Sequence, residues 1–161
     1  MNVLEHLEPK SVFRFFEEMC AIPHGSRNTK AVSDWCADFA RARGLEYHQD
    51  GDNNIIIIKE AAPGYEAAPP VILQGHLDMV CEQTADCQKD MSREGLDLAV
   101  DGDFVYAKGT TLGGDDGIAV AMALALLDAE GLPHPRLEAV FTVDEEIGLL
   151  GAASIDVTPL K

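Results

Sequence analysis

The segment 71–78 reads VILQGHLD, a continuously apolar run followed by two ionisable side chains. A short run that is apolar at consecutive positions is typical of a strand buried on both faces of a sheet, and Val71-Ile72-Leu73 is predicted to be one. The strand is expected to end at Gln74-Gly75, so that His76 and Asp78 follow it directly. Ligand sites in α/β sheets lie beyond the carboxyl ends of strands, which makes this pair the first candidate for a functional site.

The residues before this segment predict two helices and a hairpin. The second helix buries one stripe of apolar residues at helical spacing and ends at Gly44. The turn 22–26 between the two helices is expected to be structural rather than catalytic. Extended runs at 45–49 and 54–59 flank a strong hairpin turn at 50–53.

The residues after this segment continue the alternation of strands and helices. Runs at 96–100 and 104–108 around an Asp-Gly-Asp turn predict a second hairpin. A helix from about Asp116 is apolar almost all round, which indicates that it is buried, and residues 137–143 predict another strand. Because strands and helices alternate, we expect an α/β sheet with helices on its faces.

The composition excludes several function classes. At 161 residues the chain is about the size of one domain, and its 47% hydrophobic and 25% charged residues are ordinary for a globular protein. Its 28 acidic and 12 basic side chains leave a net charge of −16. No nucleic-acid or anionic-membrane partner is therefore expected, because binding to either depends on clustered Lys and Arg.

The chain is expected to be cytoplasmic. Its first segment, MNVLEHLEPK, lacks a basic leader and an apolar run of signal-peptide length, and no run of about 18 apolar residues occurs. Cys20, Cys36, Cys81 and Cys87 form no Cys-x-x-Cys pair. In a reducing compartment they are expected to remain free thiols.

Ionisable side chains occur at three comparable places. His76 and Asp78 follow the first strand, Asp115-Asp116 lie where a glycine-rich loop leads into the apolar helix, and Glu145-Glu146 follow the strand 137–143. If the sheet brings these segments to one edge, an imidazole and several carboxylates meet there. This ligand set suits zinc, manganese or cobalt, and carboxylate-rich pockets with one His per ion are typical of paired-metal hydrolytic sites.

Each of these patterns also has a structural interpretation. His76 and Asp78 could lie on a surface turn; alternatively, Asp78 lies on the same face of an extended chain and hydrogen-bonds the second ring nitrogen of a metal-binding His76. Asp115 and Asp116 could cap the helix, whose dipole favours acidic side chains at its start. The acidic triplet that starts at Asp144 could be a solvated charge run, although mutual repulsion would raise its pKa values unless cations neutralise it.

In combination, these segments resemble a known family. The matching segments are VILQGHLDMV at 71–80, GTTLGGDDGI at 109–118, EEIG at 145–148 followed by Gly151-Ala152, and the shorter IPH at 22–24. From about residue 10 onward, the chain resembles the aminoacyl-histidine dipeptidases, the peptidase D or cytosol non-specific dipeptidase group of the M20 metallopeptidase family. The resemblance implies a zinc-peptidase-like mixed sheet flanked by helices, of which residues 1–161 would be the N-terminal, incomplete part.

The resemblance also implies a role for each candidate residue. His76 would bind one metal ion, Asp115 would bridge two, and Glu146 would bind the other. Asp78 would orient His76, and Glu145 would be the general base that takes a proton from a water held between the metals. The implied cofactors are two divalent ions, zinc first, with cobalt or manganese as alternatives. The implied reaction is hydrolysis of unblocked dipeptides, including Xaa-His.

The chain departs from the family pattern in two ways. Gly114 and Asp116 stand where the family usually has Ala and Asn, which adds a negative charge beside the bridging carboxylate. The family's remaining metal-binding acid and His, and its lid domain, would lie beyond Lys161. We therefore expect the 161-residue chain alone to bind metal weakly and to hydrolyse little, and a homodimer is an expectation for the full-length enzyme only.

Two other functions stay open from the sequence. One is an N-acyl amino acid deacylase of the same superfamily. The stretch Thr110-Thr111-Leu112 favours the dipeptidase over this deacylase. The other is a non-catalytic metal-binding domain that has kept the scaffold. The presence of both Asp78 and Glu145 argues against this second alternative, because neither is assigned as a metal ligand and only catalysis requires both.

Overall fold

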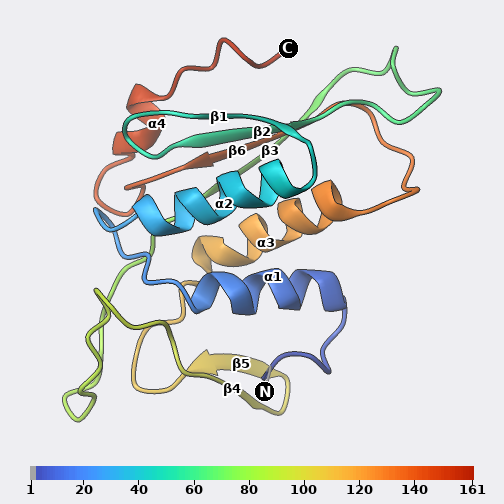
Figure 1. Ribbon diagram of the computed structural model, residues 1–161. Helices are drawn as coiled ribbons and strands as arrows, with labels where there is room; N and C mark the ends of the chain where they lie inside the picture. Colours follow the sequence, from blue (N-terminus) through green and yellow to red (C-terminus); the bar gives the residue numbers. More distant parts are fainter. Residues whose placement is uncertain (1–2) are drawn as a thin grey trace.

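The main sheet is a mixed sheet of four strands. The computed structural model describes residues 3–161 (Figure 1). The strands lie in the order β1-β2-β6-β3, with bounds Glu46–Gln49, Ile55–Lys59, Leu137–Thr142 and Val71–His76. β1 pairs antiparallel with β2 and β2 antiparallel with β6, whereas β3 runs parallel to β6. Because β3 and β6 are parallel neighbours, their carboxyl ends meet at one edge of the sheet.

Helices lie mainly on one side of this sheet. α2 (Lys30–Ala42) packs against β1 and β2, α3 (Gly114–Asp128) packs against β3 and β6, and α1 (Lys10–Cys20) packs against α3 (Figure 1). The short α4 (Leu150–Ser154) lies on the other side, next to the C-terminal segment. Among the helices of residues 3–161, none combines the length and the hydropathy that crossing a bilayer requires.

Both expected hairpins are confirmed. β1 and β2 are joined by the turn at 50–53, and the pair β4 (Leu98–Asp101) and β5 (Phe104–Ala107) forms a separate two-stranded sheet beside α1 (Figure 1). Gly44 has a left-handed backbone (φ +65°) directly after α2, which is the conformation expected of a residue that ends a helix.

The core is built around four consecutive isoleucines of β2, Ile55–Ile58. Successive side chains of a strand point to opposite faces, so the first and third pack with Phe141 of β6 in the core shared with the helices. The second and fourth pack on the other face, under Ile155 and Leu160 of the C-terminal segment. All four are buried, which fixes β2 as a central strand.

Two expectations about burial are wrong. β3 is an edge strand, and Val71 and Ile72 are 42% and 52% exposed, because no strand within the described residues pairs with its outer side. α3 is not buried all round either, since Met122 and Leu126 are 51% and 38% exposed. One face of α3 packs on α1 and the sheet while the other faces solvent.

Candidate metal and active site

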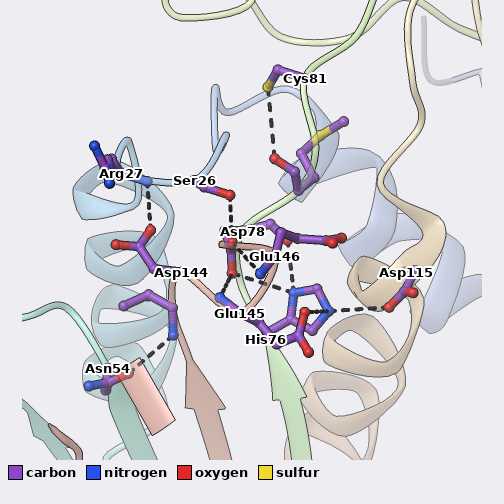
Figure 2. Close-up of polar contacts among 12 residues, drawn as sticks. Ser26, Arg27, Asn54, His76, Asp78, Cys81, Asp115, Asp144, Glu145 and Glu146 are labelled. Carbon is purple, nitrogen blue, oxygen red and sulfur yellow. Dashed lines mark hydrogen bonds and ion pairs between the residues drawn. The ribbon is translucent and has the colours of Figure 1, made fainter. Parts of the chain in front are cut away.

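Three segments that are far apart in the sequence meet at the carboxyl edge of β3 and β6. His76 is the last residue of β3, Glu146 follows β6, and Asp115 lies at the start of α3 (Figure 2). One ligand atom from each of the three lies within 4.8 Å of the other two. The structure therefore brings together one imidazole nitrogen and two carboxylate oxygens, as the strand ends predict.

The loop before α3 determines where Asp115 points. Gly113 has a left-handed backbone (φ +68°), and a Cβ there would lie 2.9 Å from the Met79 sulfur, so this position requires glycine. Asp115 and Asp116 have non-helical backbone angles, so the regular part of α3 begins only after them. The side chain of Asp115 is 88% exposed, and its Oδ1 lies 3.2 Å from His76 Nε2. Asp115 therefore extends from the helix start into the open side of the site.

The ring of His76 is buried, and both of its nitrogens have partners. Nδ1 lies 2.9 Å from the backbone oxygen of Asp78, whereas the Asp78 carboxylate is further away, at 3.5 Å. The predicted partner of Nδ1 is the Asp78 carboxylate, whereas in the structure the backbone oxygen of the same residue is the nearer one. A carbonyl oxygen only accepts hydrogen bonds, so Nδ1 donates to it. In the neutral ring Nε2 then carries the lone pair that could bind a metal ion, whereas in the protonated ring Nε2 donates to Asp115.

Asp78 is buried and uses its carboxylate to hold the segments around His76. Oδ1 accepts a hydrogen bond from the backbone N–H of Glu145 (3.0 Å), and Oδ2 accepts one from the N–H of Glu146 (3.4 Å). Oδ2 also accepts from the hydroxyl of Ser26 at 2.8 Å (Figure 2). Asp78 thus fixes the backbone on which both candidate glutamates stand.

Ser26 is the residue that sequence reasoning missed. It lies in the turn 22–26, which was expected to be structural, and its partner Asp78 is 52 positions further along the chain. A serine in a turn is too common to indicate such a contact from the sequence alone.

The acidic triplet after β6 divides into one residue that faces away and two that face the site. Asp144 has a left-handed backbone (φ +55°), and its Oδ1 accepts a hydrogen bond from the backbone N–H of Arg27 at 2.6 Å. Figure 2 shows its carboxylate pointing away from His76. Glu145 lies on the site, with Oε2 at 3.8 Å from His76 Nε2.

The negative charges of the site shift the pKa of His76 upward. Burial lowers this pKa, but the hydrogen bond to Asp115, the Asp78 carbonyl and the charges of Asp78 and Asp116 together outweigh burial. Burial is also the main reason that the pKa of Asp116 is raised, and the nearby charges of Asp115 and Glu145 raise it further.

The carboxylates of the site have no basic side chain to neutralise them. Within residues 3–161, no Lys or Arg forms an ion pair with Asp115, Glu145 or Glu146, and His76, when protonated, pairs with Asp115 and Glu145. Excess negative charge at an open edge is the electrostatic environment that a divalent cation stabilises, and imidazole with carboxylate oxygens is a ligand set for zinc, cobalt or manganese.

Sequence comparison places this chain among known peptidases. Residues 72–156 match the family model described as Peptidase family M20/M25/M40. The chain is 38% identical over 152 residues to the cytosol non-specific dipeptidase of Escherichia coli (strain K12), in an alignment that covers 94% of this chain and 31% of that protein.

Solved structures with the same fold agree with this result. The crystal structure of aminoacylhistidine dipeptidase from Vibrio alginolyticus matches with a TM-score of 0.94 and 36% sequence identity, over 98% of this chain and 32% of that chain. A tripeptidase from Staphylococcus aureus matches with a TM-score of 0.76 and 22% identity, over 94% of this chain and 41% of that one, and so shares the fold.

The expected resemblance and the mixed α/β fold are both confirmed by these matches. The chain spans about a third of the length of the two dipeptidases. Because the family model covers more than half of the 161 residues, the chain belongs to peptidase family M20/M25/M40.

Proposed function

We propose that this chain contributes metal ligands and the general base to an enzyme that hydrolyses the peptide bond of unblocked dipeptides, including Xaa-His. The observation that carries the proposal is the convergence of His76, Asp115 and Glu146, whose ligand atoms lie within 4.8 Å of one another. The names of the E. coli and Vibrio relatives support a dipeptide substrate.

The donor set fits two divalent metal ions, zinc first and cobalt or manganese next. His76 Nε2 would bind one ion and Glu146 the other, and the exposed carboxylate of Asp115 would bridge them. When bound, such ions act as Lewis acids that polarise the scissile carbonyl and lower the pKa of water. Asp78 holds His76 and the backbone of both glutamates in place for this purpose.

Glu145 is the general base in this proposal. Its carboxylate lies at the site without belonging to the ligand group, with Oε2 at 3.8 Å from His76 Nε2. It accepts a proton from the attacking water and passes it to the nitrogen of the leaving amino acid. The hydrogen bond from its backbone N–H to Asp78 keeps the base at a fixed distance from the ligands.

Exchange of the two neighbouring glutamates for glutamine tests this assignment. In the longer enzyme to which this chain would contribute, Glu145→Gln is expected to retain zinc stoichiometry while Xaa-His hydrolysis falls at least about 100-fold, the scale of general-base catalysis. Glu146→Gln is expected to lose zinc. Loss of zinc in Glu145→Gln with retention in Glu146→Gln would show that the two roles are exchanged.

The substrate class has its own test. A panel of dipeptides and N-acyl amino acids, measured on the zinc-loaded full-length enzyme, separates the dipeptidase from the deacylase. Hydrolysis of the blocked amino acids with no cleavage of dipeptides would overturn the dipeptidase proposal. Cytoplasmic location and a homodimer of the full-length enzyme stay predictions, the first supported by the word "cytosol" in the name of the E. coli relative.

A further inference from the structure

Two clefts in the described part of the chain differ in whether they touch the candidate site. The larger, about 710 Å³, is lined by Arg43, Lys59 and Asp128 among others, and shares no residue with the site. Three of its charged side chains already have partners, because Arg43 pairs with Asp128 and Lys59 donates to backbone carbonyls at the end of α3. The second cleft, about 480 Å³, has Glu146 in its wall.

We propose that the second cleft is the subsite that receives an apolar, uncharged side chain of the dipeptide, and that it thereby selects the substrate. The proposal rests on the function proposed above, because Glu146 is both a wall residue and a member of the candidate ligand group. A dipeptide whose scissile carbonyl lies at the ligand group carries its side chains only two bonds from that carbonyl or from the amide nitrogen. One of these side chains can therefore enter a cleft that begins at Glu146.

Most of the wall surface of the cleft is apolar. It is supplied by thioether, thiol and aliphatic side chains (Met79, Val80, Cys81, Met91 and Ile147), while Ser26, Asn28, Ser92 and Glu146 add polar groups. No basic side chain lines the cleft, so an acidic side chain would have no counter-charge there and would face Glu146. A volume of about 480 Å³ lies in the usual range for small-ligand pockets. Methionine side chains adapt to different shapes, so the cleft suits aliphatic and aromatic side chains alike.

The cleft is formed before any substrate arrives. Gly25 and Met79 form a parallel β-bridge, in which the N–H of Met79 donates to the carbonyl of His24 and the N–H of Ser26 donates to the carbonyl of Met79. A Cβ at position 25 would lie 2.6 Å from the sulfur of Cys81, so glycine there is what allows this thiol to pack against the bridge. The bridge, together with the hydrogen bond from the Ser26 hydroxyl to Asp78, fixes the wall segments 25–26 and 79–81 relative to Asp78, Glu145 and Glu146.

A substitution that fills the cleft tests the proposal by kinetics. Met91 lines the cleft and makes none of the hydrogen bonds that hold the ligand group, so Met91→Trp is the filling variant. Met122→Trp, on the exposed face of α3, is the matched control. The measurement, made on the longer enzyme to which this chain would contribute, is kcat/KM for Gly-Gly and for dipeptides with Leu or Phe at either position. For each dipeptide with one Leu, we compare its kcat/KM with that for Gly-Gly. In Met91→Trp this ratio is expected to fall at least about tenfold when Leu is at one of the two dipeptide positions. In Met122→Trp the ratio is expected to stay unchanged. An equal fall for Gly-Gly and the Leu dipeptides would overturn the proposal.

A labelling experiment tests the cleft without turnover. Cys81 is exposed and lines the cleft, whereas Cys20 and Cys36 are buried, so a Cys87→Ser background leaves Cys81 as the accessible thiol. N-ethylmaleimide labelling of Cys81, followed by mass spectrometry, is expected to slow at least about threefold more with Leu-containing dipeptides than with Gly-Gly. Equal labelling rates with both overturn the subsite. If the longer enzyme hydrolyses no dipeptide at all, the proposed function fails, and the labelling rates still decide whether the cleft binds apolar side chains.

Discussion

Replacement of Asp78 by asparagine tests how the buried carboxylate organises the site. Three donors point at its two oxygens: the hydroxyl of Ser26 and the backbone N–H groups of Glu145 and Glu146. In Asp78→Asn, one oxygen becomes an NH₂ group. If the nitrogen takes the place of Oδ1 it faces the N–H of Glu145, and if it takes the place of Oδ2 it faces the N–H of Glu146. In either orientation one backbone N–H loses its acceptor.

The size of the effect follows from these contacts. A hydrogen bond to a charged group contributes about 1.5–3 kcal/mol, so the free energy of unfolding should fall by about 2–3 kcal/mol. The lost bond also releases the backbone of a glutamate at the site, and the carboxylate near His76 Nδ1 loses its charge. Zinc affinity should therefore fall by about 10- to 100-fold, the usual effect of removing a group that orients metal ligands.

Two measurements and one control show whether Asp78 acts on the site through its hydrogen bonds or only through its negative charge. Zinc affinity is measured by competition with a chromogenic chelator, and stability by urea unfolding of the metal-free protein. Asp144→Asn is the control, because it removes the same charge one residue before Glu145 while its carboxylate faces Arg27 and not the site. An equal fall in zinc affinity in both variants would refute the geometric role. A fall in stability without any change in zinc affinity would show that Asp78 is only structural.

Three further predictions follow from the packing and ionisation of this chain. Burial opposes ionisation of Asp128, but its contacts with Arg43 and Arg14 together outweigh burial and lower its pKa. The stabilisation from these contacts is present above the unfolded pKa of about 3.9 and is lost as the pH falls through the folded value, so the free energy of unfolding, measured in urea at a series of pH values, should fall less with decreasing pH in Asp128→Asn than in the unmodified protein. Phe141→Ala should lower the free energy of unfolding in urea by about 3–5 kcal/mol, because the side chain is fully buried. Burial above all raises the pKa of Cys20 to about 12, so at neutral pH N-ethylmaleimide should modify exposed Cys81 and leave Cys20 intact until the protein unfolds, as mass spectrometry would show.

The meeting of the candidate ligands could be predicted because it depends on local patterns and one general rule. His76 and Glu146 follow apolar runs that read as strands, and Asp115 lies where a glycine-rich loop enters an apolar helix. Parallel neighbouring strands place their carboxyl ends at one edge, which is the arrangement of β3 and β6.

The strand order could not be predicted in the same way. Val71-Ile72-Leu73 has the composition of a strand covered on both faces, yet β3 lies at the edge and Ile72 is half-exposed. An apolar run indicates only that the segment has apolar surface to bury. The position of a strand in the sheet depends on pairing with distant segments. The same limit applies to Ser26, whose contact with Asp78 exists only once the turn 22–26 has docked beside β3.

Two adjacent glutamates can reach the same site only because β6 has already ended. Neighbouring side chains of a regular strand point to opposite faces, so Glu145 and Glu146 could not both face the ligand group if β6 continued beyond Thr142. Instead, Asp144 takes a left-handed backbone, the N–H groups of Gly148 and Leu149 both donate to the carbonyl of Glu145, and the chain turns there. The two carboxylates are proposed to act as proton acceptor and metal ligand. These separate roles depend on a tight turn whose backbone N–H groups donate to the Asp78 carboxylate, and not on the spacing of the residues in the sequence.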